Sequence, residues 1–243
     1  MKLKCLACEA LARLVYLYAA HSPHIVDIEL FQLGWHNDPS DLRARLQARI
    51  DAVGHDEYDA IVMAYGLCGQ ATAGLVARDT PIVIPRAHDC ITLFLGSRER
   101  YTAESTAHPG TYWYVQDYIE RNPKPGTTLS LGSGTGDEIG ELYAEYVKKY
   151  GQDNADYLIE VMGAWQQHYD RAVYIDLGVG DGAGVETQTR ETAARRGWTF
   201  ERMPGDPALI RQLLQGDWNN DFVILSPGKQ IVMSYDQEVL NSG

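Results

Sequence analysis

Apolar positions along the chain predict short strands of two kinds. Residues 25–31 partly alternate between apolar and polar side chains, which predicts a strand with one buried face. Residues 60–64 are a continuous apolar run, typical of a strand that is covered on both faces, and residues 172–177 predict another buried strand. Residues 3–4 and 81–84 predict two further short strands.

Helical patterns fill the segments between these strands. Residues 9–20 are rich in Ala, Leu and Arg, and a helix of small residues is expected to end at Arg78. Asp38 and Pro39 form a helix start, with Asp38 as the cap, and apolar side chains follow at intervals of four residues up to Ile50. Strands that alternate with helices at this spacing predict an α/β fold with a parallel sheet.

Three regions are expected along the chain. Residues 1–105 contain all four cysteines and predict one α/β lobe, and residues 171–243 predict a second. Residues 106–170 are aromatic and glycine-rich, with helices expected at about 137–150 and 153–169, and they connect the two lobes. The expected fold is therefore two Rossmann-like lobes with parallel sheets, whose strands end around a shared cleft.

The second lobe resembles a diverged copy of the first. The dipeptide Asp-Pro at 38–39 recurs at 206–207, and residues 59–63 match residues 221–225 after a short gap. Any two βαβ units share helix-start and strand signals, so chance similarity stays open beside an internal duplication.

Composition and charge exclude several classes of protein. Of 243 residues, 45% are hydrophobic, which excludes a disordered or low-complexity chain. The net charge of −12 argues against binding to nucleic acid or to anionic lipid, because both need clustered cations. No apolar run reaches the roughly 20 residues of a membrane span. The first residues lack the apolar core of a signal peptide, so we expect a cytoplasmic protein with reduced thiols, and an oligomer is compatible with the sequence.

The four cysteines follow predicted strands. Cys5 and Cys8 form a C-x-x-C pair where the first strand is expected to turn into its helix, and Cys68 and Cys90 follow the third and fourth strands. The carboxyl ends of parallel strands meet at one edge of a sheet, so we expect the four sulfurs to converge on one metal site. Four thiolates bind zinc or an iron–sulfur cluster. Ligands from separate loops of a large sheet favour the cluster, with zinc as the alternative.

Two other interpretations of these thiols stay open. Free cysteine is among the most buried residue types and fits a crowded sheet edge as a small hydrophobe. Alternatively, Cys5 and Cys8 alone are a redox-active C-x-x-C pair, an interpretation that leaves Cys68 and Cys90 unexplained.

Polar and glycine residues beside the cysteines are further candidates. Arg86 and His88 follow the fourth strand as candidate catalytic residues, and His88 is equally a candidate ligand or an ordinary loop histidine. Glu9 is a candidate contact for a bound species, or it only complements a helix dipole. Gly66 and Gly69 would let the backbone approach a ligand.

A glycine-rich loop in the second lobe is the other candidate site. Gly178, Gly180 and Gly182 follow a predicted strand and precede a helix, as in loops that bind nucleotides or adenosylmethionine. A tight turn without a ligand is the alternative. A similar loop at residues 129–136 lacks a long strand before it.

Three cysteine motifs resemble a known family. The segments LKCLACEALA at residues 3–12, YGLCG at 65–69 and PRAHDCITLFLGSRERY at 85–101 look like the motifs of a prokaryotic family catalogued as a domain of unknown function. Members of that family are common in anaerobes, often beside genes for corrinoid-dependent methyl transfer. The resemblance therefore implies one-carbon metabolism, with a small molecule, a corrinoid or a methyltransferase as the partner.

The sequence as a whole predicts a metal-binding protein with an iron–sulfur cluster on four cysteines at a two-lobe cleft. A nucleotide-like ligand or a corrinoid would bind beside it. One alternative is a cysteine hydrolase or transferase with Cys68 as nucleophile and His88 as base. The others are a zinc-binding protein and a methyltransferase-like protein that uses adenosylmethionine.

Overall fold

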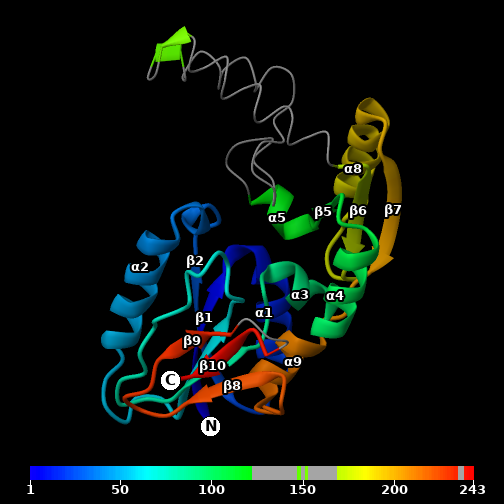
Figure 1. The fold of residues 1–243 in the computed structure, drawn as a ribbon. Helices are drawn as coiled ribbons and strands as arrows, with labels where there is room; N and C mark the ends of the chain where they lie inside the picture. Colours follow the sequence, from blue (N-terminus) through cyan, green and yellow to red (C-terminus); the bar gives the residue numbers. More distant parts are fainter. Residues whose placement is uncertain (122–146, 149–150, 153–168, 235–237) are drawn as a thin grey trace. The chain divides into compact units, whose positions relative to one another are not determined.

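The protein has a mixed α/β, Rossmann-like fold, as predicted. The computed structural model describes residues 1–121, 147–148, 151–152, 169–234 and 238–243, and Figure 1 labels most of its helices and strands. Both larger sheets contain parallel strands.

The chain divides into two compact units. Unit 1 comprises Met1–Glu104, Leu177–Gly180 and Pro204–Gly243, and unit 2 comprises Ser105–Asp176 and Asp181–Met203. This division differs from the expected one, because the C-terminal 40 residues belong with the N-terminal lobe and not with a lobe at 171–243.

A five-stranded sheet forms the centre of unit 1. Its order is β2 (Ile25–Phe31), β1 (Lys2–Cys8), β3 (Ala60–Ala64), β4 (Ile82–Pro85) and β8 (Phe222–Leu225). The first four strands are parallel, and β8 runs antiparallel to β4. The carboxyl ends of four neighbouring strands therefore lie at one edge.

Helices cover both faces of this sheet. On one face α1 (Ala12–Ala20) packs against α9 (Ala208–Gln215), which also contacts β3 and β4. On the other face, apolar side chains of α2 (Pro39–Asp51) pack on Leu6 and Met63. The predicted cap of α2 is confirmed, because the backbone N–H groups of its first turn donate to Asp38 Oδ1 at 3.1 Å.

The C-terminal hairpin explains one difference from the sequence-based expectations. It consists of β9 (Ile231–Met233) and β10 (Leu240–Ser242), which are antiparallel. Residues 71–78 form turns and not the predicted helix, because the backbone at Gly74 and Leu75 is hydrogen bonded to Ile231 of the hairpin.

The segments compared as an internal duplication lie in the same sheet. Helix α2 leads into β3, and α9 leads into β8, so each pair is a helix followed by a strand. However, β3 is a central parallel strand and β8 is an antiparallel edge strand. The two segments do not build two separate lobes.

Unit 2 contains a three-stranded sheet and an aromatic core. The strands are β5 (Thr111–Tyr114), β6 (Arg171–Asp176) and β7 (Thr199–Pro204), and α8 (Ala183–Arg196) packs on β6. Tyr112 stacks on Trp198 with 5.6 Å between ring centroids. Of the expected connecting segment, β5 and α5 (Gln116–Glu120) are described, whereas the predicted helices at 137–150 and 153–169 lie almost wholly outside the described residues.

The other described helices of unit 1 and its boundary are η1 (Glu9–Leu11), η2 (Trp35–Asn37), α3 (Cys90–Leu95) and α4 (Arg98–Ala107). Among the described residues, no helix has the length and apolarity that crossing a membrane requires.

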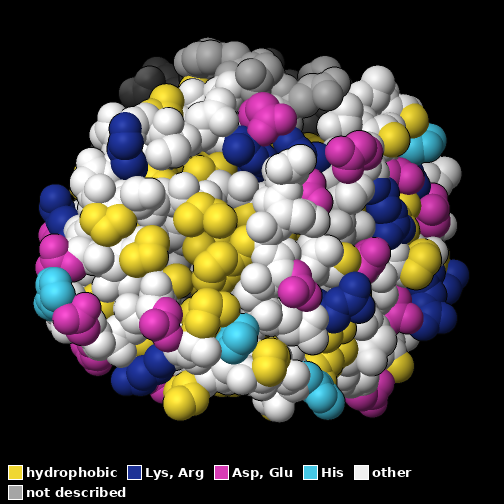
Figure 2. Space-filling model, turned by 90° about the horizontal axis from the view of Figure 1, so that it is seen from below, with side chains coloured by type: hydrophobic (Ala, Val, Ile, Leu, Met, Phe, Trp, Pro, Cys, Tyr) yellow, Lys and Arg dark blue, Asp and Glu magenta, His cyan; other side chains and the backbone are white. Residues whose placement is uncertain are grey.

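On the face drawn in Figure 2, basic side chains are interspersed with acidic ones and do not gather into one patch.

Candidate functional site

Strand β1 is longer than predicted, and this separates the two cysteines of the C-x-x-C pair. The strand continues through Cys8, so Cys5 lies in its middle and pairs with Ile28 and Val62 on either side. Side chains alternate between the two faces of a strand, so residues three apart project to opposite faces. Cys5 is fully buried, whereas Cys8 is partly buried at the carboxyl end of the strand. The expected C-x-x-C turn is therefore not formed.

The loop that contains Cys68 is fixed to the loop that follows β4. The N–H of Leu67 donates to the carbonyl of Ala87 at 2.8 Å, and the N–H of Cys68 donates to the carbonyl of His88 at 2.9 Å. Gly66 is required at this contact, because a Cβ there would lie 2.7 Å from the backbone nitrogen of Asp89.

Cys68 begins a left-handed turn. Cys68, Gly69 and Gln70 have φ values of +46°, +63° and +73°, a conformation that residues other than glycine seldom adopt in succession. The guanidinium of Arg43 in α2 donates to the carbonyl of Gln70 at 2.5 Å. The turn is thus held from the neighbouring helix, and it places Cys68 beyond the end of β3.

Cys90 is the first residue of α3, and Asp89 caps that helix. The N–H groups of Ile91 and Thr92 donate to Asp89 Oδ1 at 2.9 and 3.2 Å. The hydroxyl of Tyr101 donates to the second carboxylate oxygen at 3.2 Å. Both oxygens of Asp89 are therefore used to orient the turn in which Cys90 lies.

Three of the four thiols are electrostatic neighbours. Burial raises the pKa of Cys8 to about 11. Burial also raises the pKa of Cys68, and Cys8 and then Asp89 add to that effect. The pKa of Cys90 is raised by burial first, and then by Asp89, Cys68 and Cys8. Cys8 and Cys68, at the carboxyl ends of β1 and β3, also pack against the same core cluster.

Three aromatic side chains lie beside these thiols. Tyr65 stands at the end of β3, and its ring meets that of Phe31 edge to face at 6.3 Å. Burial raises the pKa of the Tyr65 hydroxyl, with further contributions led by Cys8 and Cys68. Trp35 packs against the same core cluster as Cys8 and Cys68.

The thiols do not form a site for a single metal ion. Within the described part of the chain, no three His, Cys, Asp or Glu side chains are arranged so that they could hold one ion. A single zinc ion needs sulfur ligands about 4 Å apart, whereas a cubane cluster separates them by about 6–7 Å.

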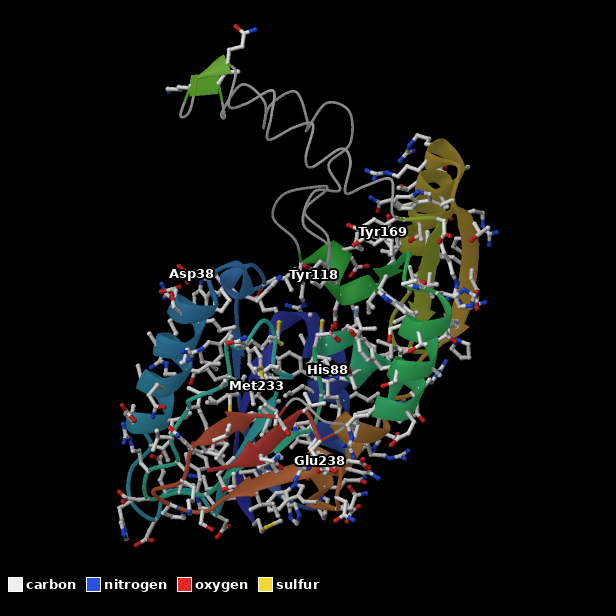
Figure 3. All side chains as sticks on the ribbon, viewed as in Figure 1. Asp38, His88, Tyr118, Tyr169, Met233 and Glu238 are labelled. Atoms are coloured by element: carbon white, nitrogen blue, oxygen red, sulfur yellow. The ribbon has the colours of Figure 1, made fainter. Side chains whose placement is uncertain are left out.

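Arg86, His88 and Glu9 have other contacts. Arg86 forms an ion pair with Glu238 in the C-terminal segment. His88 is exposed and stacks on Tyr101 at 5.6 Å, and Figure 3 shows it beside α3. Glu9 accepts a hydrogen bond from the N–H of Leu33 at 3.0 Å, which joins η1 to the segment after β2.

The glycine loop of residues 178–182 connects β6 to α8, as predicted. Gly178 and Gly180 have φ values of +65° and +83°, and a Cβ at Gly178 would meet no atom within 4 Å. Gly182 differs, because the hydroxyl of Tyr174 occupies the space that its Cβ would need. The loop is open at Gly178 and closely packed at Gly182.

Asp89 and Tyr101 have roles at the site that the sequence-based candidates left out. The signal for Asp89 was present, because an aspartate directly before an apolar run is a helix-cap pattern. Tyr101 ends the motif at residues 85–101, but nothing in local spacing shows that it reaches back to Asp89.

Comparison with known protein families finds a match over most of the chain. The model of a family described as a protein of unknown function, DUF1638, matches residues 30–214. The match includes Cys68 and Cys90, begins after Cys8 and ends before the C-terminal hairpin. No curated protein and no solved structure matches the chain.

Proposed function

Because the chain belongs to DUF1638, a family of proteins of unknown function, we propose a function from its own side chains: it is a metalloprotein in which Cys8, Cys68 and Cys90 bind an iron–sulfur cluster. One observation supports this assignment above the others. At the carboxyl ends of adjacent parallel strands, Cys8 adds to the raised pKa of Cys68, and Cys68 and Cys8 add to the raised pKa of Cys90. Thiolate ligands of this number and softness select iron–sulfur clusters or zinc.

The backbone around the thiols supports a cluster. An N–H of Ala10 is hydrogen bonded to the sulfur of Cys8, and the backbone of Gly66 is hydrogen bonded to the sulfur of Cys68. Hydrogen bonds to cysteine sulfur stabilise the thiolate form and tune the potential of iron–sulfur centres. The close packing of Gly66 on Asp89 keeps two of the ligand loops at a fixed separation.

Cys5 is outside the proposed ligand set. It lies in mid-strand on the opposite face from Cys8, and burial raises its pKa to about 12. A three-cysteine set leaves one iron of a cubane without a protein ligand. When bound, such a cluster supplies either electron transfer or a position for a substrate or partner group.

The cysteine hydrolase alternative has less support from this geometry. A nucleophilic cysteine needs a lowered pKa and a general base within reach. The pKa of Cys68 is raised by burial, and the exposed His88 stacks on Tyr101. A role in anaerobic one-carbon metabolism, with a corrinoid-linked partner, stays part of the proposal on the resemblance of the motifs alone.

Anaerobic purification and reconstitution test this function. The protein is incubated with ferrous iron and sulfide, desalted, and measured for iron, sulfide, zinc and visible absorbance. We expect broad brown absorbance and about four irons per chain, as for a cubane cluster. The variants Cys8→Ser, Cys68→Ser and Cys90→Ser should lose most of the iron, and Cys5→Ser, the matched control, should keep it. A colourless protein that binds zinc, or iron loss in Cys5→Ser equal to that of the others, would overturn the assignment.

A further inference from the structure

The C-terminal hairpin is joined to the segment that follows the Cys68 turn. The N–H of Gly74 donates to the carbonyl of Ile231 at 2.7 Å, and the N–H of Ile231 donates to the carbonyl of Leu75 at 2.9 Å. Strand β9 therefore extends this segment as a small antiparallel pairing, a few residues after the Cys68 turn.

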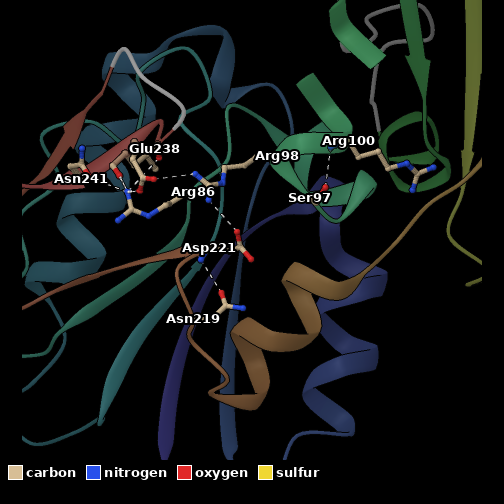
Figure 4. A network of polar contacts seen from close by, with 9 residues as sticks. Arg86, Ser97, Arg98, Arg100, Asn219, Asp221, Glu238 and Asn241 are labelled. Atoms are coloured by element: carbon tan, nitrogen blue, oxygen red, sulfur yellow. Dashed lines mark hydrogen bonds and ion pairs between the residues drawn. The ribbon is translucent and has the colours of Figure 1, made fainter. Parts of the chain in front are cut away.

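The same hairpin holds the segment on either side of α3. Arg86, just before α3, donates to Asn241 Oδ1 at 3.0 Å and pairs with Glu238 Oε2 at 2.9 Å. Arg98, just after α3, lies 3.9 Å from Glu238 Oε1 and 3.2 Å from Asp221 Oδ1. Figure 4 shows both guanidinium groups facing Glu238. One carboxylate thus bridges the two ends of the helix in which Cys90 lies.

A strained turn presents this carboxylate. The N–H of Leu240 donates to the carbonyl of Glu238 at 2.6 Å, and Val239 between them has a φ of +63°. A three-residue turn with positive central φ is rare, and a β-branched residue in it is an outlier. Such strain persists only where the surroundings determine it, and Val239 is 1% exposed within the core. The turn holds Val239 in the core and Glu238 between the two arginines.

We propose that Glu238, with Arg86 and Arg98, is a clamp that positions the Cys68 and Cys90 loops, and that its opening exposes both thiols. We name these three residues the C-terminal clamp. The inference rests on the proposed function only for the role of the two thiols as ligands. The clamp forms without bound metal, because none of its three side chains is a proposed ligand.

The clamp is expected to respond to ionic strength. The side chain of Glu238 is 47% exposed, whereas those of Arg86 and Arg98 are about 16% and 15% exposed. Ion pairs with a partly exposed member weaken as salt screens them. Salt should therefore open the clamp without unfolding unit 1.

Alkylation of the metal-free protein tests the clamp. The full chain is treated with iodoacetamide, and the rate at each cysteine is followed by peptide mass spectrometry. In Glu238→Gln we expect several-fold faster labelling of Cys68 and Cys90, with Cys5 unchanged. Asp51→Asn is the matched control, since it removes another partly exposed ion pair of unit 1, between Asp51 and Arg78 at 2.7 Å.

Salt separates a positioning role from a merely structural one. In the wild-type chain, added sodium chloride should speed labelling of Cys90, and in Glu238→Gln labelling should be fast and independent of salt. Equal rates in wild type and Glu238→Gln would overturn the proposal. So would a parallel rise at Cys5 with a lower melting temperature, because that reports general destabilisation. Neither result depends on iron binding, so the clamp and the cluster can fail separately.

Discussion

Gly66 lies directly against the backbone of Asp89. A Cβ on Gly66 would be 2.7 Å from the nitrogen and 2.8 Å from the Cα of Asp89, and 2.9 Å from the carbonyl oxygen of Ala87. All three are backbone atoms, which cannot move aside as the end of a flexible side chain can. The loops after β3 and β4 therefore approach as closely as they do because residue 66 has no side chain.

Gly66→Ala should destabilise unit 1 by about 1–3 kcal/mol, the usual cost of an added methyl group in a tightly packed site. Urea denaturation measures the change. Gly184→Ala in α8 is the control, because its Cβ would meet nothing within 4 Å, and helix propensity favours Ala there by up to about 1 kcal/mol. A stable Gly66→Ala variant would show that the two loops can separate.

Tyr101→Phe should lower stability by about 1–2 kcal/mol, because it removes a hydrogen bond to the half-buried carboxylate of Asp89. The carboxylate then loses the hydrogen bond at Oδ2 and keeps those at Oδ1, which caps α3. Thermal unfolding of Tyr101→Phe is compared with Tyr16→Phe, whose side chain is exposed. If the two variants melt alike, the Tyr101 hydroxyl does not hold Asp89.

Elements with a clear local pattern were predictable from the sequence. The apolar run of β3 and the Asp-Pro start of α2 appear where they were expected. The extent of β1 was not predictable, because its last residues pair with β2 and β3, and a cysteine gives no signal for strand or turn. Residues 71–78 look helical locally and are held in turns by Ile231, more than 150 positions away.

The candidate site was predictable in part. Topology alone puts Cys8, Cys68 and Cys90 at one edge, since Cys8 ends one parallel strand and Cys68 and Cys90 follow two others. The opposite orientation of Cys5 depends on where β1 ends, which the sequence does not show. The contact between Arg86 and Glu238 joins residues that are 152 positions apart, and no local pattern relates them.

The pH dependence of stability should include a contribution from Asp38. Hydrogen bonds from Ser40 and Asp41 lower the pKa of this carboxyl below its ordinary value of 3.8. A lowered pKa in the folded state stabilises the protein above the unfolded value, and this stabilisation is lost as the pH falls through the folded value. The difference in unfolding free energy between wild type and Asp38→Ala should therefore be constant near neutral pH and shrink below 3.8.

Urea denaturation across this pH range checks the effect, with Asp38→Asn as the control. Asn retains a capping oxygen but does not titrate, so this variant should be capped at every pH. If the difference in unfolding free energy between wild type and Asp38→Ala does not change as the pH falls into the acid range, Asp38 is not the titrating group.

Leu225→Ala should destabilise unit 1 by about 2–5 kcal/mol, the range for large-to-small substitutions in a hydrophobic core. Leu225 in β8 is fully buried and belongs to the same core cluster as Leu6 and Met63. Native-state hydrogen exchange should show faster exchange of the amides of β1 and β3. If hydrogen exchange speeds up only in unit 2, Leu225 does not belong to the core of unit 1, and a separate C-terminal lobe is supported instead.

Gly182 and Tyr174 should be energetically coupled within unit 2. A Cβ at Gly182 would overlap the Tyr174 hydroxyl, with the ring carbon behind it at 3.0 Å. Gly182→Ala should therefore cost about 1–3 kcal/mol by overpacking, and Tyr174→Phe should recover part of that loss because it removes the overlapping atom. Gly178→Ala has open space but a φ of +65°, so its cost of about 1–2 kcal/mol arises in the backbone and Tyr174→Phe should leave it unchanged. A double-mutant cycle by urea denaturation measures both pairs. Coupling at 178 equal to that at 182 would mean that the loop responds as a whole, and that the Tyr174 hydroxyl does not determine the glycine at 182.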